Sequence, residues 1–213
     1  MNDNHDLINN NQVCVVGEVL ENPVFSHESY GENIYKFELS IERVSGYKDV
    51  IPVQVSKKLL DSNHDYEGAK VSICGQIRTF NQRFENGKSK LRIYIFARNI
   101  DVVGQDTQDV NEVALNGFIC KPVVKRTTPL GREIADLLIG VNRPYGSSDY
   151  IPCICWGRDA IYAERELPVG APITILGRIQ SRAYTKRFED ETEIEGIAYE
   201  VSASQLAIRE GQA

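Results

Sequence analysis

Two aromatic side chains in the second half of the chain are placed where they could stack against flat rings. Tyr150 and Trp156 fall on one face of an expected strand, because strand side chains point alternately to opposite faces. The other face carries Ile151, Cys153 and Cys155, which are small and apolar and suit a core. We therefore expect the aromatic pair to face outward, and the alternative is that Trp156 caps the core.

Cations accompany these aromatics. Residues 178–188 contain no acid but four cations and two aromatics, namely Arg178, Arg182, Lys186 and Arg187 with Tyr184 and Phe188. Residues 121–132 also lack acids and carry Lys121, Lys125, Arg126 and Arg132. A single-stranded nucleic acid is held by aromatic rings under its bases and cations along its phosphates. The sequence therefore predicts such a surface, and the alternative is an ordinary solvated face.

The chain contains an internal repeat. Residues 13–103 and 113–208 share an order of strands, glycines and turns, and residues 31–52 match residues 131–152 at seven of twenty-two positions. An offset near one hundred indicates duplication of a whole domain, since solenoid repeats recur every ~20–50 residues. We predict two domains, residues 1–106 and 107–213.

Each half is expected to form five strands. In the first half, apolar alternation and turn residues place them at 13–20, 34–42, 50–56, 70–80 and 91–103. A helix is expected over 157–166, with a weaker counterpart at 57–65. A short helix between strands three and four of a five-stranded all-β unit is the order of an OB-fold barrel. The fold class is therefore predicted to be all-β, with two tandem OB-fold barrels.

Two motifs carry a resemblance to a known family. Residues 149–160 (DYIPCICWGRDA) and 170–182 (GAPITILGRIQSR) resemble the bacterial single-stranded DNA-binding protein family. The resemblance implies that Tyr150 and Trp156 stack on bases, that Arg158 follows them, and that Tyr184 and Tyr145 add further stacking positions. The candidate nucleic-acid contacts are Tyr145, Tyr150, Trp156, Arg158, Arg178, Arg182, Tyr184, Lys186, Arg187, Phe188, Lys125, Arg126, Arg132 and Arg143.

The resemblance also implies an assembly and a cellular role. Family members present four barrels to the strand, so a two-barrel chain would reach that number as a homodimer. Family members that serve as the cell's main protector of single-stranded DNA carry a long tail with an acidic tip. This sequence ends five residues past its last expected β-strand. We therefore expect no tail-mediated recruitment and a specialised role in DNA replication, repair, recombination or mobile-element maintenance.

The first half resembles the family in framework only. Val50 and Ser56 stand where the second half has Tyr150 and Trp156. Weaker first-half candidates for strand contact are Arg43, Tyr47, Lys48, Arg78, Phe80, Arg83, Phe84 and Lys88. We hypothesise that the second barrel grips bases, while the first contributes mainly assembly and phosphate contacts; packing under the hairpin is the alternative for Phe80 and Phe84.

Composition excludes several other functions. His5 lies in the polar N-terminal segment, and His27 and His64 lie in expected loops, so the histidines form no catalytic or metal-binding set. We therefore expect neither an enzyme nor a cofactor. The longest apolar runs are too short to span a membrane. The five cysteines are read as reduced core residues of a cytoplasmic protein.

Two alternatives to DNA binding remain at this stage. Net charge is −6, with no overall basic field to attract nucleic acid. This charge fits an OB-fold protein-interaction or replication-restart assembly module with little direct strand binding. RNA in place of DNA is the second alternative, since stacking does not distinguish the sugar.

Overall fold

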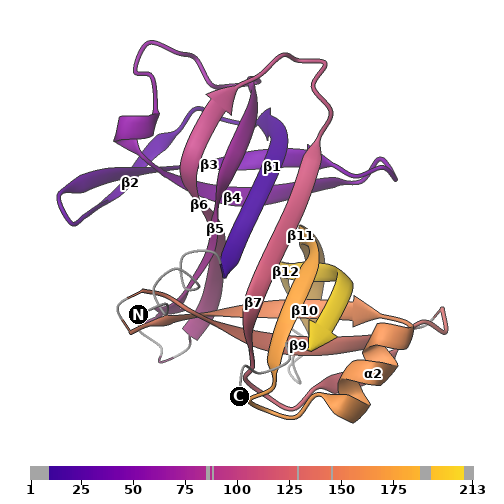
Figure 1. The fold of residues 1–213 in the computed structure, drawn as a ribbon. Helices are drawn as coiled ribbons and strands as arrows, with labels where there is room; N and C mark the ends of the chain where they lie inside the picture. Colours follow the sequence, from indigo (N-terminus) through magenta and orange to yellow (C-terminus); the bar gives the residue numbers. More distant parts are fainter. Residues whose placement is uncertain are drawn as a thin grey trace.

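The chain folds into two β-barrels joined edge to edge (Figure 1). In this computed structural model we describe residues 10–84, 87, 89–128, 130–144, 146–187 and 193–208, without the side chains of 186, 187, 193 and 194. Strands dominate the fold, as the all-β prediction requires. No helix among these residues is long and apolar enough to cross a membrane.

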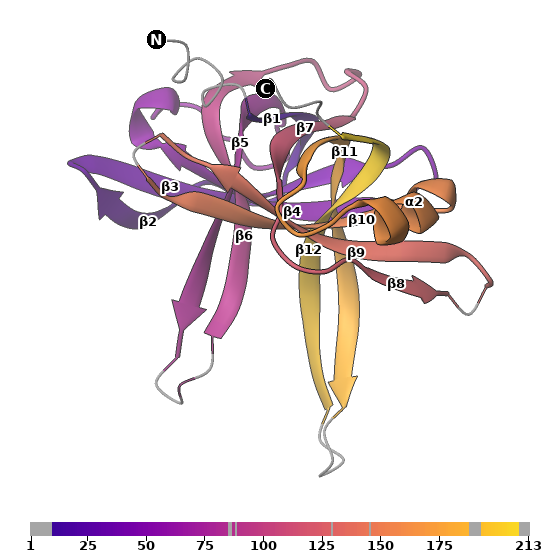
Figure 2. The same ribbon diagram turned by 60° about the horizontal axis from the view of Figure 1, so that its bottom comes forward.

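The first barrel is built from six strands and one helical turn. They are β1 (Asn11–Val19), β2 (Val24–Ser29), β3 (Glu32–Glu42), β4 (Lys48–Ser56), the 3₁₀ turn η1 (Lys57–Leu59), β5 (Lys70–Arg83) and β6 (Ser89–Val102). Antiparallel β1–β3 and parallel β4–β6 pairings close the barrel. The β5–β6 hairpin extends beyond it and is called the first arm (Figure 2).

The second barrel repeats this order. Its elements are β7 (Val110–Ile119), β8 (Val124–Thr127), β9 (Glu133–Asn142), β10 (Ser148–Trp156), helix α2 (Arg158–Glu166), β11 (Pro172–Arg187) and β12 (Glu193–Ile208). Its β11–β12 hairpin, the second arm, projects from the same side of the molecule as the first arm (Figure 2).

The prediction of five strands per half was too low by one, because β2 and β8 are additional strands. Both pair with one neighbour at the edge of the sheet and are largely exposed, so they lack the alternating burial that marks the other strands. The helix predicted over 157–166 is confirmed as α2. Its first-half counterpart is reduced to the three-residue turn η1.

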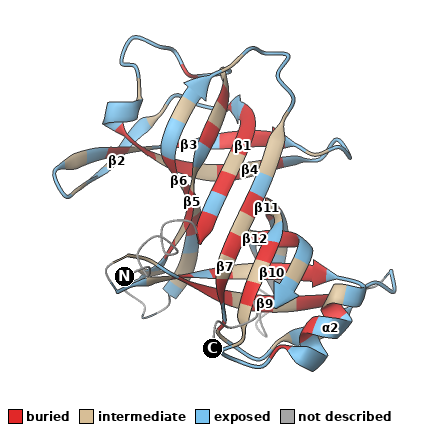
Figure 3. Ribbon diagram, viewed as in Figure 1, coloured by how far each residue is buried: buried red, intermediate tan, exposed pale blue. Residues whose placement is uncertain are grey.

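The barrels meet where β1 pairs with β7. Val13 lies opposite Val113, and Asn11 and Val15 lie opposite Leu115 and Asn111, so the pairing is symmetric about the Val13–Val113 pair. Buried and more exposed positions alternate along both strands (Figure 3). The duplicated strand therefore serves as the joint between the two copies.

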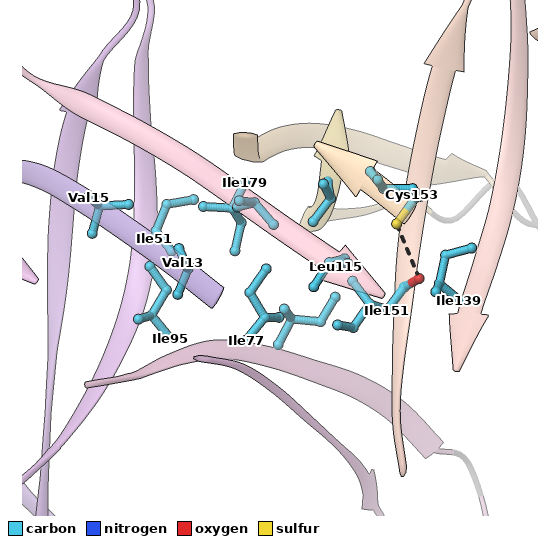
Figure 4. Packing of buried hydrophobic residues seen from close by; sticks show 14 of the residues in the cluster. Val13, Val15, Ile51, Ile77, Ile95, Leu115, Ile139, Ile151, Cys153 and Ile179 are labelled. Atoms are coloured by element: carbon cyan, nitrogen blue, oxygen red, sulfur yellow. Dashed lines mark hydrogen bonds between the residues drawn. The ribbon is translucent and has the colours of Figure 1, made fainter. Parts of the chain in front are cut away.

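The apolar cores form one continuous cluster across this joint. Val13 and Ile77 from the first barrel and Leu115, Ile151 and Ile179 from the second all belong to it (Figure 4). Each of the five is at most 1% exposed. Because burial of apolar area is the main stabilising term, the two barrels share part of their hydrophobic stabilisation.

A buried carboxylate also links each barrel to the other. Arg143 Nε donates to Asp149 Oδ2 at 2.8 Å within the β9–β10 hairpin, and Arg78 Nη1 reaches the same oxygen at 2.8 Å from the first arm. The backbone N–H of Thr79 donates to Asp149 Oδ1 at 2.6 Å. Asp149 is fully buried, so this carboxylate exchanges water for donors from both barrels.

The other half of the interface mirrors this arrangement. Arg43 Nε donates to the fully buried Asp49 at 2.6 Å, and the backbone N–H of Ser181 on the second arm donates to Asp49 at 2.7 Å. Thr79 and Ser181 thus play equivalent parts in the two arms. These contacts fix where each arm lies against the opposite barrel.

The cysteine prediction is wrong for one pair. Cys14 and Cys74 lie opposite each other on β1 and β5, with Cα atoms 4.3 Å apart, and form a disulfide. Cys74 is exposed, so it is not a core residue either. Cys153 and Cys155 are buried free thiols, and burial raises the pKa of Cys155 to about 12. Within the described ranges, no group of three His, Cys, Asp or Glu could hold a metal ion.

Candidate nucleic-acid interface

Strand β10 presents an aromatic platform, defined here as Tyr150 and Trp156. Their side chains are 48% and 40% exposed, whereas Ile151 and Cys155 are fully buried, as the alternation predicts. Trp156 lies outside the core cluster, so the core-capping alternative is not supported. The platform leaves two aromatic side chains partly open to solvent on a strand that lies between β9 and β12.

The platform is hydrogen-bonded to β12. Trp156 Nε1 donates to Ser202 Oγ at 3.2 Å, which fixes the indole ring. Ile154 shares the platform's face by sequence, yet it is 4% exposed. It lies opposite Ser202 in the parallel β10–β12 pairing, and its burial departs from what alternation alone predicts.

The second arm places cations beside the platform. Every second position of β11 from 178 to 182 carries a polar side chain, namely Arg178, Gln180 and Arg182. Gln180 Nε2 donates to Glu200 at 2.9 Å, and Arg182 Nε lies 3.8 Å from the same carboxylate. The buried Nε of Arg178 has no partner in the described part of the chain. Burial, followed by the nearby Arg43 guanidinium, lowers the pKa of Arg178. An incoming anion would offset both effects.

Two of the other predicted cations of the second half, Lys125 and Arg126, already have carboxylate partners. Arg126 Nε donates to Asp136 at 2.8 Å, and this hydrogen bond raises the pKa of Arg126. Lys125 lies 3.3 Å from Glu133. Arg132 and Arg158 are exposed. The surface around β8 is therefore less basic than residues 121–132 suggest.

Three predicted arginines lie between the barrels. Arg43 binds Asp49, and Arg78 and Arg143 bind Asp149, with the three guanidinium side chains 18–28% exposed. We leave them out of the contacts proposed below, because each already neutralises a buried carboxylate.

The remaining first-half candidates lie on hairpins. The Arg43 guanidinium stands 4.6 Å from the centroid of the Tyr47 ring, and Lys48 and Arg83 are exposed. Phe80 and Phe84 are 47% and 40% exposed, so neither is packed away under the first arm. Lys88, Tyr145 and Phe188, and the side chains of Lys186 and Arg187, lie outside the described residues.

Sequence reasoning missed a groove between the two arms. It encloses about 880 Å³ and is lined by both barrels. Its aromatic lining is Phe37, Phe80, Tyr94, Tyr184 and Tyr199, and its cations are Lys36, Lys90 and Arg92. Alternation along 91–103 could have placed Tyr94 outward, but the approach of the two arms depends on contacts between barrels.

The architecture defines the class of protein as a tandem OB-fold protein. A crystal structure of the wild-type single-stranded DNA-binding protein from Thermus aquaticus has the same fold, with a TM-score of 0.71. That likeness covers 95% of this chain and 95% of that chain at 20% sequence identity. It confirms two OB-fold barrels in one chain.

Sequence comparison points to one family. Residues 110–207 match the model of the Single-strand binding protein family, so the second half of the chain is similar to that family. A relative from Halalkalibacterium halodurans, a single-stranded DNA-binding protein, is 32% identical over 81 residues, which cover 35% of this chain and 48% of that protein. A Listeria innocua protein, single-stranded DNA-binding protein 2, is 33% identical over 81 residues, covering 35% and 51%. The chain spans about half the length of these curated relatives.

Proposed function

We propose that this protein binds single-stranded DNA without catalysing a reaction, through bases stacked on Tyr150 and Trp156. The observation that carries the proposal is the solvent-exposed platform on β10, within the half of the chain that matches the family. Each base–aromatic stack contributes about 1–3 kcal/mol. Two exposed rings on one face of β10 therefore supply a substantial part of the affinity for single-stranded DNA.

Phosphate contacts complete the proposed site. Arg178 is half-buried on β11, and Arg182 is half exposed beside Glu200. Arg158 is exposed just past the platform, at the start of α2. These three cations supply local positive charge on a molecule whose net charge is −6. Binding thus depends on local rather than global electrostatics.

Salt dependence tests this assignment. We expect log K for an oligo-dT to fall linearly with log salt, with a slope of roughly −2 if three phosphates are neutralised. Fluorescence anisotropy of a labelled oligo-dT, titrated with the full chain at several salt concentrations, measures the slope. An affinity that does not change with salt would favour the protein-interaction alternative.

We further propose that two chains associate, presenting four barrels to one strand. The proposal is supported by the family resemblance and by the two barrels that each chain contributes. Light scattering coupled to size-exclusion chromatography is expected to give twice the chain mass of 24.0 kDa. A mass that stays at that of one chain across the concentration range would contradict the proposal.

A further inference from the structure

The Cys14–Cys74 disulfide lies on the strand that joins the two barrels. β1 pairs with β5 through residues 13–18 and with β7 through residues 11–16, so Cys14 belongs to a strand with a neighbour on each edge. Val13, on the opposite face of β1, is 1% exposed, whereas Cys14 is half-buried and Cys74 is exposed. The disulfide therefore connects β1 to β5 on the outer face of the sheet, away from the apolar core.

The second barrel shows that the fold does not need this bond. Cys14 lies opposite Cys74 in the antiparallel β1–β5 pairing. The corresponding pair on β7 and β11 is Ala114 opposite Leu176, which has no sulfur. In both barrels the register with the next strand shifts directly after this position, which supports the equivalence of the two pairs. The pairing of these strands therefore forms with or without a covalent bridge.

Accessibility distinguishes this pair from the other three cysteines, and all five lie in the described part of the chain. Cys153 and Cys155 are buried, and burial raises the pKa of both thiols. Burial also raises the pKa of the half-buried Cys120. Since the thiolate is the form that attacks a disulfide, these three thiols compete poorly for the bond. An external thiol can instead reach the exposed Cys74.

We propose that Cys14 and Cys74 form a reversible redox site that exchanges with a low-molecular-weight thiol–disulfide couple of the glutathione type. In reduction, one thiolate of that class attacks the sulfur of Cys74, forms a mixed disulfide there and releases Cys14 as a thiolate, which takes up a proton. A second thiolate attacks the mixed disulfide, forms the small-molecule disulfide and releases Cys74, which is protonated in turn. Two small thiols are oxidised as one protein disulfide is reduced, and oxidation follows the same steps in reverse.

The state of this site sets how firmly β1 is held. The bond joins residues 60 positions apart, and a cross-link over a loop of that length restricts the unfolded chain. Once it is reduced, β1 is joined to β5 by noncovalent contacts alone. Because β1 also pairs with β7, reduction weakens the connection between the barrels as well as the first barrel. This regulation goes beyond the proposed function and does not depend on DNA binding.

Equilibration of the full chain with reduced and oxidised glutathione at graded ratios tests the proposal. After acid quenching and alkylation of the denatured chain, intact mass spectrometry counts the free thiols. Two of the five cysteines are bonded, so we expect the count to rise from three to five in one transition as the buffer becomes more reducing. The urea midpoint should fall by roughly 1 M over the same transition.

Variants identify the attacked sulfur and provide the control. Cys14→Ala leaves Cys74 unpaired, and this variant should take up one glutathione from the oxidised form several-fold faster than Cys74→Leu, in which Cys14 remains. The double variant Cys14→Ala, Cys74→Leu reproduces the Ala114–Leu176 pair of the second barrel. Its urea midpoint should not respond to glutathione.

Three results would overturn the proposal. A count that stays at three in excess reduced glutathione would show a permanent structural bond. A count of five in the most oxidising buffer would show that the bond does not form. Equal shifts of the urea midpoint in wild type and in the double variant would show that glutathione acts at another place in the chain.

Discussion

Replacing Trp156 by alanine is expected to weaken binding of oligo-dT by roughly 5- to 100-fold at low salt. The indole is 40% exposed, lies outside the core cluster and donates its N–H to Ser202. Its loss therefore removes a stacking surface without opening a cavity. Anisotropy of a labelled oligonucleotide measures the effect, since the variant lacks the chain's only tryptophan.

Two matched variants show whether stacking is the cause. Trp156→Phe keeps an aromatic face but loses the bond to Ser202, so it should retain most of the affinity. Tyr162→Ala removes an equally exposed aromatic that belongs to α2 and not to the platform, and it should bind as wild type. Losses of similar size in Trp156→Phe and Trp156→Ala would show that the hydrogen bond, and not the ring, carries the effect.

Replacing Asp149 by alanine is expected to destabilise the fold by about 3–5 kcal/mol. The fully buried carboxylate accepts hydrogen bonds from Arg143, Arg78 and the Thr79 N–H. Its removal leaves two partly buried guanidinium groups facing each other and a backbone donor without a partner. Urea unfolding monitored by circular dichroism gives the free energy.

Asp136→Ala is the matched control for this prediction. Asp136 also pairs with an arginine, Arg126, but its side chain is 43% exposed and solvent screens the pair. We expect a change of about 0–1 kcal/mol. If Asp149→Ala lowered the free energy of unfolding no more than Asp136→Ala does, the contacts of Asp149 between the barrels would not stabilise the fold.

The fold was predictable because its signals are local. Alternation along 150–156 placed Cys153 and Cys155 in the core and Tyr150 and Trp156 outside it, as the structure shows. The exception, Ile154, is buried and pairs with Ser202 on β12, a residue 48 positions further along the chain. Helix α2 was visible for the same local reason, since its residues favour helix between a glycine and a proline.

The contacts between barrels could not be predicted in the same way. Arg43 and Arg143, and Asp49 and Asp149, recur at one spacing, and that recurrence is compatible with an ion pair inside each hairpin. Nothing in the sequence brings Thr79 or Ser181 to these carboxylates, because those contacts depend on how β1 pairs with β7. The Cys14–Cys74 disulfide likewise depends on the register between β1 and β5.

The fluorescence of Trp156 offers the most direct test of DNA binding by the second barrel. It is the only tryptophan in the chain, so its emission reports on the platform alone. Titration of the intact wild-type protein with oligo-dT at low salt should quench this emission to a saturable limit, and added salt should reverse the quenching. Emission that stays unchanged while a labelled oligonucleotide is bound would show that the strand lies elsewhere, and no binding at all would contradict the proposed function.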